Sequence, residues 1–589
     1  MSVGLIAWGR FVDSSGRRIT VPAPSTEHGA PWLWDHIAGM TQELGRIGFT
    51  ALQLPPASKV QGGAGSGCDG YGVFDPRDIG SKNQQGSIPT RYGTAESLRH
   101  LVASAHASGM DVFLDVVLHQ LSGGSNGVYR YLGADGHTLN GRGAMSPGCF
   151  RGAPPRRPED AVPVPADDFE FGDEKVYQNC QPAGYTIHDA LDYGDWLFRT
   201  TGADGARFDD TKGTWPAFVH EFMTTDAMKS KAFLSEYFDG DPGNLNWWAT
   251  SPPMSGRSGV EDFTLHWRIQ AACNGYNASQ FTSNSMGYWQ WRSDLAYGFV
   301  DNPDTDTSPG QQVMFNKLLA YAFLLSLPLR MALIYGKDYF PSTVWPGAYG
   351  LKHGIDNLIW INRMFAFGGC EVRWADQSVI ALSRDGNGGP AGWSGGLLTC
   401  LNFDTFNWRT IKVQTTFGSN RQLHDYTGHH PDIWTDSNGM ATVNIPPNAY
   451  SSGESYCCFA PAGVNQPITV TPRETTQTFF GAPDLDIGPA TDTARTIARV
   501  YCAKDKPIKA VLTADRTGWQ GLSSTQMQIL APSSTPSIGC NLPVTGASTV
   551  TTESITTETG WHSIIIAGNK MPPTGAVFAV SVTYMGANV

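Results

Sequence analysis

Four segments of the chain share one pattern, in which a short apolar run ends in a group of polar side chains. The runs begin at Asp111, Gly205, Lys231 and Tyr297, and a helix-like run at residues 97–108 precedes the first of them. Alternating strands and helices, with polar groups where the strands end, are typical of a (β/α)8 barrel, because such barrels carry their active sites at the C-terminal ends of parallel strands. The pattern therefore predicts a barrel with a polar cleft at that end.

The segment 205–213 carries the clearest chemical signal. It contains Arg207 and Asp209, which are two residues apart and therefore leave a strand on the same face. A guanidinium fixed beside a carboxylate favours the charged form of the carboxylate. A carboxylate that attacks an electrophile or stabilises a cation needs such a neighbour, although an ordinary structural ion pair would have the same spacing.

In this order the four segments resemble the four signature regions of the alpha-amylase family of glycoside hydrolases. The signature segments and the further stretches that fit the family are residues 111–120, 205–213, 231–239, 297–306, 49–59, 71–75, 80–94 and 423–448. The resemblance covers roughly residues 1–463, and so many segments in one order make a chance match improbable.

The resemblance implies a role for three carboxylates. Asp209 matches the nucleophile, Glu236 the general acid/base, and Asp304 the third carboxylate, which binds sugar hydroxyls. In a retaining glycosidase the first two lie about 5–5.5 Å apart. Because the acid must hold a proton near neutral pH, we expect Glu236 to lie in a drier or more negative environment than Asp209.

The same resemblance implies a set of substrate-binding residues. Tyr71 would stack on a sugar ring, Arg207 would hold the nucleophile ionised, and Lys212 would contact hydroxyls on the leaving-group side. Gln120 and Asn302 occupy signature positions that face the sugar in the family.

Two signature regions depart from the family pattern. The first usually ends in Asn-His, where this chain has His119 and Gln120, and the fourth usually reads Asn-His-Asp, where this chain has Pro303 in the middle. Gln120 can still donate from its amide, whereas a proline side chain and its nitrogen donate nothing. Each lost hydrogen bond would cost on the order of 1–3 kcal/mol, so catalysis would slow or sugar preference would change.

These departures leave three functions open. The first is an endo-acting hydrolase of α-1,4-glucosidic bonds in starch, glycogen or malto-oligosaccharides. The second is a transglycosylase, or a hydrolase of another α-linked polysaccharide. The third is a catalytically weak carbohydrate-binding or interaction protein on an amylase scaffold. The retained set Arg207, Asp209, Glu236 and Asp304 favours an enzyme, since a binding protein has no need of it.

Calcium is a doubtful expectation. The family position of a calcium ligand holds His119, and calcium prefers oxygen donors while imidazole suits transition metals. The acidic run 167–174 offers oxygen ligands elsewhere, but a solvated loop explains it better. No metal site is therefore predicted, and the chemistry needs no cofactor.

Four domains are expected along the chain. They are a barrel at residues 1–120 and 186–374, an inserted domain at 121–185, an antiparallel β-sandwich at 375–463, and a C-terminal β-sandwich at 464–589. In the last, Trp519 and Trp561 are either core residues, which we favour, or stacking platforms of a carbohydrate-binding or attachment module. Among ten cysteines, Cys149 with Cys180 and Cys502 with Cys540 are plausible disulfides, and buried free thiols are the alternative.

Composition agrees with a sugar-binding protein. Charged residues are only 16%, with 18 Trp and 20 Tyr, and a net charge of −12 disfavours a nucleic-acid partner. The longest apolar run, 318–334, contains Pro328 and Arg330 and suits a buried barrel helix better than a membrane span. Residues 1–10 lack the features of a secretory signal, which leaves a cytoplasmic, a mature secreted or a phage-borne protein open. The oligomeric state is not indicated.

Overall fold

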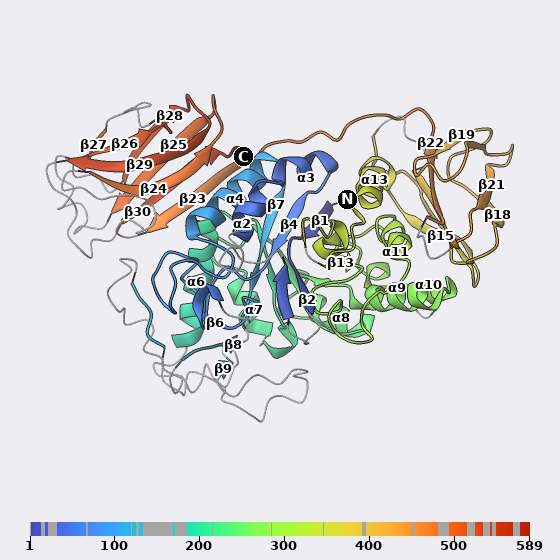
Figure 1. Cartoon of the computed structure of the whole chain (residues 1–589), viewed down its shortest axis with the longest axis horizontal. Helices are drawn as coiled ribbons and strands as arrows, with labels where there is room; N and C mark the ends of the chain where they lie inside the picture. Colours follow the sequence, from blue (N-terminus) through green and yellow to red (C-terminus); the bar gives the residue numbers. More distant parts are fainter. Residues whose placement is uncertain are drawn as a thin grey trace. The chain divides into compact units, whose positions relative to one another are not determined.

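A computed structural model describes residues 2–12, 18–21, 32–65, 69–118, 120–124, 129–133, 169–170, 185–214, 216–283, 285–345, 347–390, 396–449, 454–480, 494–514, 525–533, 542–544, 549–568 and 578–589 (Figure 1). Within these ranges no helix has both the length and the apolar character that a membrane crossing requires. The expectations for His119, most of the acidic run 167–174, Trp519, Cys149 and Cys180 fall outside the described residues.

Eight parallel strands close into a barrel. In chain order they are β1 (Ser2–Ile6), β4 (Ala51–Leu54), β7 (Asp111–Val116), β10 (Gly205–Phe208), β11 (Ala232–Ser235), β12 (Gly259–Glu261), β13 (Ala296–Phe299) and β14 (Met331–Tyr335). Each strand pairs with the next, and β14 returns to β1, with Ser2 opposite Met331 and Ile6 opposite Tyr335. Almost all strand residues are buried, as expected for a barrel filled by its own side chains. The predicted (β/α)8 barrel is confirmed.

Helices occupy the segments between the barrel strands. They are α2 (Leu33–Ala38), α3 (Thr41–Ile47), α4 (Ala95–Ala107), α6 (Tyr185–Thr201), α7 (Pro216–Phe222), α8 (Pro242–Thr250), α9 (Phe263–Gly275), α10 (Ser279–Thr282), α11 (Lys317–Leu324), α12 (Gly336–Tyr339) and α13 (Lys352–Phe365). Thr94 and Ser97 form a reciprocal capping box that starts α4, and Asp241 and Asp262 accept backbone N–H groups at the starts of α8 and α9. The apolar run 318–334 forms α11 and leads into β14, as predicted.

Three short antiparallel pairs extend from the barrel loops. They are β2 (Gly9–Val12) with β3 (Arg18–Val21), β5 (Lys59–Val60) with β6 (Val73–Asp75), and β8 (Gln120–Leu121) with β9 (Phe169–Glu170). The last pair places Gln120 opposite Glu170, within the predicted inserted domain 121–185. Most of that insertion lies outside the described residues.

An antiparallel sandwich follows the barrel. Its strands are β15 (Cys370–Ala375), β16 (Val379–Arg384), β17 (Leu397–Asn402), β18 (Arg409–Gln414), β19 (Gln422–Asp425), β20 (Ile433–Trp434), β21 (Met440–Ile445) and β22 (Tyr456–Pro461). Six strands form one sheet in the order β15-β16-β17-β22-β19-β20, and β18 pairs with β21. Along β18 and β21 buried and exposed residues alternate, because one face packs on the sandwich core and the other meets solvent.

The C-terminal region forms a second sandwich. Its strands are β23 (Glu474–Phe480), β24 (Ala494–Cys502), β25 (Pro507–Ala514), β26 (Thr525–Leu530), β27 (Leu542–Val544), β28 (Thr549–Ile555), β29 (Gly560–Gly568) and β30 (Phe578–Met585). Two four-stranded antiparallel sheets, β23-β30-β25-β28 and β24-β29-β26-β27, share one apolar core. Cys502 is a free thiol in this core, and its suggested partner Cys540 lies outside the described residues.

The C-terminal sandwich packs against α4 and α6 rather than standing apart as a separate module (Figure 1). The buried Gln477 on β23 donates to the carbonyl oxygens of Arg99 (3.0 Å) and Thr201 (2.9 Å) on those helices. Trp561 packs against the His100 ring of α4, with ring centroids 5.1 Å apart. Trp561 is therefore a packing residue. The alternative role as a sugar-stacking platform has no support.

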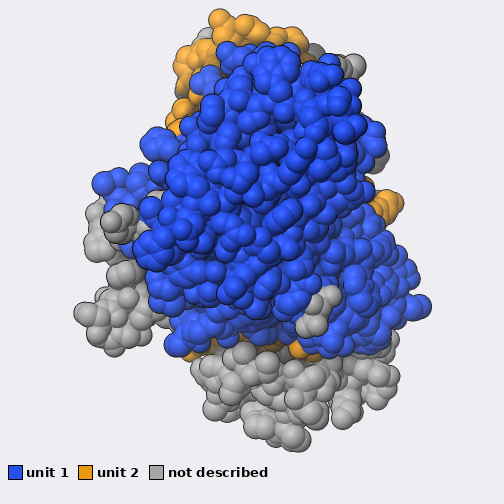
Figure 2. Space-filling model, turned by 90° about the vertical axis from the view of Figure 1, so that its right-hand side faces the viewer, with its two compact units in different colours: residues 1–22, 46–52, 234–469 blue, residues 23–45, 53–233, 470–589 orange. Residues whose placement is uncertain are grey.

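Contacts divide the chain into two compact units, which are coloured separately in Figure 2. One unit holds residues 1–22, 46–52 and 234–469, and the other holds residues 23–45, 53–233 and 470–589. The division falls within the barrel, so that Arg207 and Asp209 belong to the second unit and Glu236 and Asp304 to the first.

Candidate active site

Arg207 joins two carboxylates at the end of β10. Its Nη1 atom donates to Asp209 Oδ1 over 2.9 Å and to Asp115 Oδ2 over 2.9 Å. Asp115 lies directly opposite Arg207 on the neighbouring strand β7. Arg207 and Asp115 are each only 3% exposed, so the attraction acts where little water screens it. The predicted pairing of Arg207 with Asp209 is confirmed, and Asp115 is an additional partner.

Tyr71 is held at the same cluster. Its hydroxyl donates to Asp115 Oδ2 over 2.8 Å, which fixes the ring that was predicted to stack on sugar. Gln120 donates from Nε2 to the Tyr71 carbonyl oxygen over 3.3 Å. Tyr71, Gln120, Asp115, Arg207 and Asp209 therefore form one hydrogen-bonded group within their unit.

Lys212 lies in η4 (Thr211–Gly213), a single 3-10 turn directly after β10. The turn begins at Asp210, whose φ of 36° and ψ of 62° place it in the left-handed region that non-glycine residues rarely adopt. Such backbone strain is common at functional sites. Lys212 is half-buried, and its contact with the leaving-group sugar stays a prediction.

Glu236 is the first residue after β11. It is buried, with 8% exposed, whereas Asp209 is half-buried. Desolvation favours the protonated form of a carboxyl group. The difference in burial thus has the direction that the sequence predicted for the acid and the nucleophile.

Asp304 lies in a turn after β13 that Asn302 shapes. Asn302 Oδ1 accepts from the backbone N–H of Asp304 (3.0 Å) and of Thr305 (2.8 Å). The Asp304 side chain keeps 42% of its surface exposed. Because the Asn302 oxygen is committed to this turn, any contact between Asn302 and a sugar must come from its Nδ2 group.

Arg10 is a residue that the sequence reasoning missed. It lies in β2, and its guanidinium forms an ion pair with Asp304 and lies over the Trp8 ring, 5.2 Å from the ring centroid. Its side chain is only 7% exposed. The sequence did contain a signal for Arg10. As in the four signature segments, a polar side chain follows an apolar run, here residues 3–8.

A buried ionic network supports the turn around Asp304. Lys317 Nζ lies 2.6 Å from Asp301 Oδ2 and 2.7 Å from Asp338 Oδ1, and both carboxylates are fully buried. Burial raises the pKa of both carboxyl groups, and the Lys317 charge opposes the rise. Next to them, Lys337 forms an ion pair with Asp306. Asp301 and Asp306, from the segment 297–306, and Asp338, from α12, thus support the turn.

No metal site is defined by the structure. Among the described residues, no three His, Cys, Asp or Glu side chains gather where an ion could bind. His119, whose place at the family's calcium-ligand position argued against calcium, lies outside those residues. Calcium therefore stays open, as the sequence left it.

A closed parallel barrel with carboxylates following its strands, joined to an antiparallel sandwich, has the architecture of a barrel enzyme. Residues 397–452 match the family model described as the alpha-amylase C-terminal domain. An alpha-amylase of Geobacillus stearothermophilus is 26% identical over 469 residues, covering 70% of this chain and 82% of the relative. The cytoplasmic alpha-amylase of Escherichia coli is 23% identical over 483 residues, covering 70% and 93%.

Solved structures show the same fold. The alpha-amylase of Malbranchea cinnamomea superimposes with a TM-score of 0.56 at 17% identity, over 78% of this chain and 96% of that one. The acarbose complex of the Geobacillus thermoleovorans alpha-amylase gives a TM-score of 0.55 at 14% identity, over 79% and 98%. The chain is thus similar to alpha-amylases in sequence, and it shares their fold.

Proposed function

We propose that this protein is a retaining α-glucan hydrolase that cleaves internal α-1,4-glucosidic bonds of starch, glycogen or malto-oligosaccharides. The observation that carries the proposal is the Asp115–Arg207–Asp209 cluster, a desolvated guanidinium beside a half-buried carboxylate at a barrel strand end. The alpha-amylases among its relatives support the substrate class.

The first half-reaction forms a covalent sugar–enzyme ester. A carboxylate oxygen of Asp209 attacks the anomeric carbon, and the bond to the leaving oxygen breaks as Glu236 gives that oxygen its proton. Arg207 keeps Asp209 ionised and fixes its carboxylate plane through the 2.9 Å hydrogen bond. The burial of Glu236 favours the protonated state that this step requires.

The second half-reaction releases the sugar. Glu236, now a carboxylate, takes a proton from a water molecule whose oxygen attacks the anomeric carbon, and Asp209 leaves as a carboxylate. Two inversions restore the α configuration. If a sugar hydroxyl takes the place of water, the same intermediate yields a longer glucan, so transfer is a variant of this mechanism.

Asp304 would bind hydroxyls of the sugar in the cleavage subsite. Its exposed side chain suits this task, and the turn shaped by Asn302 holds it in place. Pro303, directly before Asp304, has no hydrogen-bond donor. Arg10 places its guanidinium donors beside Asp304. Arg10 thus acts as a positioning residue that holds the Asp304 carboxylate in place.

The test is product analysis. Purified protein and its Glu236→Gln variant are incubated with soluble starch, glycogen, pullulan, dextran and maltoheptaose, and products are separated by chromatography. Cleavage of the α-1,4-glucans that the variant loses supports the proposal. Longer products would show transfer, and no reaction on any substrate would refute the hydrolase in favour of a binding role.

A further inference from the structure

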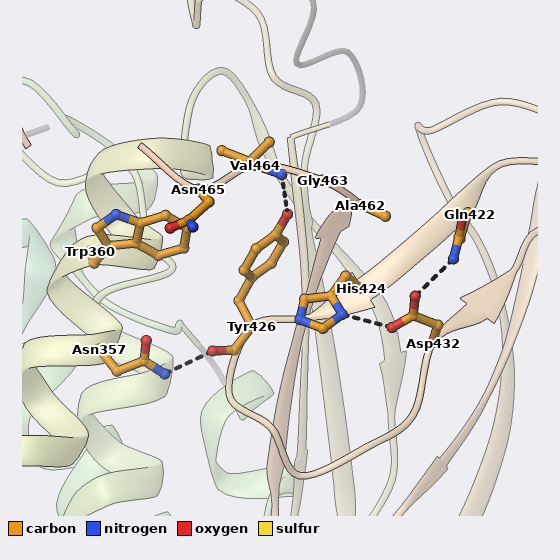
Figure 3. Close-up of a pocket in the computed structure, with 10 residues that line it drawn as sticks. All are labelled: Asn357, Trp360, Gln422, His424, Tyr426, Asp432, Ala462, Gly463, Val464 and Asn465. Atoms are coloured by element: carbon orange, nitrogen blue, oxygen red, sulfur yellow. Dashed lines mark hydrogen bonds and ion pairs between the residues drawn. The ribbon is translucent and has the colours of Figure 1, made fainter. Parts of the chain in front are cut away.

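A hollow lies between helix α13 and strand β19 of the first sandwich (Figure 3). It has a volume of about 820 Å³ and is open to solvent on one side. Its lining comes from α13, β19, the loop before β20 and residues 462–465, and none of it comes from the end of a barrel strand. The hollow is thus built from other elements of the fold than those that carry the proposed catalytic residues.

Two aromatic rings form one wall of the hollow. The Trp360 and Tyr426 centroids lie 5.4 Å apart, with the rings inclined by 47°. Their polar ends are already bonded: Trp360 Nε1 donates to the Gln466 carbonyl oxygen (2.9 Å), and the Tyr426 hydroxyl donates to the Pro461 carbonyl oxygen (2.7 Å). The Tyr426 oxygen also accepts from the backbone of Val464 over 3.1 Å, as Figure 3 shows. Both rings are therefore fixed in advance, so a ligand that stacks on them would cost little side-chain entropy.

A carboxylate also lines the hollow, beyond His424, whose ring adjoins Tyr426 (Figure 3). Asp432 accepts from His424 Nδ1 (2.6 Å) and from Gln422 Nε2 (2.8 Å), and these dashed contacts are drawn in Figure 3. The hydrogen bond from His424 is the main reason that the pKa of Asp432 is lowered. Asp432 is therefore ionised at neutral pH, and an ionised carboxylate that stays 39% exposed is a strong acceptor for hydroxyl groups.

Trp434 flanks the hollow on the edge strand β20, although it is not one of the lining residues. It pairs with Gln422 across β19 and β20, so both side chains leave on the same face of the sheet. Trp434 is 61% exposed. From Gln422 to Tyr426 the strand advances by roughly 13 Å, which is the length of a short oligosaccharide rather than of one sugar ring. Gln422 and His424 are exposed between these aromatic residues, whereas Leu423 is buried on the other face.

We propose that this hollow, lined by Trp360, Tyr426 and Asp432 and flanked by Trp434, is a non-catalytic binding site for an α-glucan chain, separate from the proposed catalytic residues. Apolar faces of sugar rings stack on fixed aromatic rings, and their hydroxyls donate to the carboxylate. None of the ten lining residues is Lys or Arg, which disfavours a phosphorylated or acidic ligand. The mixture of aromatic and polar groups disfavours a purely apolar ligand. The choice of an α-glucan rests on the proposed function.

The experiment compares retention in native gels that contain soluble starch, glycogen or dextran. Trp434→Ala, Asp432→Ala and the conservative Trp434→Phe are made in the Glu236→Gln background, so that the polysaccharide is not consumed. Trp408→Ala is the matched control, because Trp408 is a 55% exposed tryptophan of the same domain outside the hollow. Melting temperatures confirm that each variant is folded.

The proposal expects Trp434→Ala and Asp432→Ala to weaken retention on starch and glycogen about five- to tenfold. Trp434→Phe and Trp408→Ala should behave like the parent, and Trp434→Ala with Glu236 intact should keep the parent kcat/KM on maltotetraose. Unchanged retention in Trp434→Ala, equal loss in Trp408→Ala, or a parent that no α-glucan retains would overturn it. If the parent is retained through Trp434 but the protein cleaves no glucan, the proposed hydrolase function is refuted and the binding site stands. If the protein cleaves α-glucans but Trp434→Ala leaves retention unchanged, the binding site is refuted and the hydrolase function stands.

Discussion

The Arg207 guanidinium and the Asp209 carboxylate lie 2.9 Å apart on one strand, and the same guanidinium nitrogen reaches Asp115 on the next strand. One buried cation thus serves two carboxylates. Removing it would leave two negative charges in a site that water barely reaches, which is costly for both stability and the ionised state of the nucleophile.

Replacing Arg207 should therefore damage both properties. We expect Arg207→Met to lower the free energy of unfolding by about 3–5 kcal/mol and to abolish turnover of maltoheptaose. Arg207→Lys keeps the charge but loses the planar fork, so it should retain more stability and only a small part of the activity. Urea denaturation and initial rates measure the two effects. Arg199→Met, which removes a half-exposed arginine paired with Asp195, is the control and should change little.

Arg10 should act through Asp304. If Asp304 binds sugar most tightly in the transition state, Arg10→Met should lower kcat on maltoheptaose by about 10- to 100-fold with a small change in KM. Arg10→Lys should restore part of kcat. Arg292→Met, which removes a half-buried arginine of the same unit that pairs with Asp294, is the control. A rise in KM alone, with kcat intact, would contradict a positioning role for Arg10.

Much of the barrel and part of the site could be predicted from the sequence. Arg207 and Asp209 are two residues apart, so the sequence alone predicts that both side chains lie on the same face of a strand. The second partner, Asp115, could be assigned only once β7 and β10 were known to be neighbours. Arg10 escaped prediction because Asp304 is 294 residues away along the chain.

The roles of two other residues also could not be assigned from residue type. Asn302 was predicted to bind sugar, and the structure shows that its oxygen shapes the turn of Asp304, a local contact that residue type alone does not reveal. Trp561 could be either a core residue or a platform until α4 was found against it. A tryptophan can either pack in a core or stack on a ligand, and the element that lies against it decides which role it has.

The Lys317 network gives a prediction on stability. Lys317→Met would leave Asp301 and Asp338 buried without their shared cation, so we expect a loss of about 3–5 kcal/mol in the free energy of unfolding at pH 7. Burial raises the pKa of both carboxyls in the folded state, and stability from such groups is lost as pH rises through the folded pKa. The deficit should therefore shrink when unfolding is measured near pH 4. A deficit independent of pH would contradict this explanation.

His100 should make the protein sensitive to acid. Burial lowers the pKa of His100 to about 4, and its Nε2 atom has no hydrogen-bond partner among the described residues. It packs against Tyr501 and Trp561, and the nearby Arg499 is paired with Glu96. The stabilising effect of a neutral His100 is present above pH 6.5 and is lost as pH falls toward 4, with a size of about 3 kcal/mol.

The measurement is the free energy of unfolding against pH for the parent and for His100→Phe, which keeps a ring in place. We expect the variant to lose less stability between pH 6.5 and 4 than the parent does. His353→Phe, at an exposed histidine of α13, should leave the pH dependence as it is in the parent. Parallel curves for the parent and His100→Phe would refute the role of His100.

The central claim is that Asp209 and Glu236 act as nucleophile and acid/base of a retaining glycosidase. Proton NMR of the first products released from maltoheptaose tests it most directly, because the new reducing end reports the configuration before it mutarotates. The mechanism predicts that the α anomer appears first with the parent protein, and that Asp209→Asn and Glu236→Gln release no product on the same timescale. Initial release of the β anomer, or undiminished cleavage by Asp209→Asn, would contradict it.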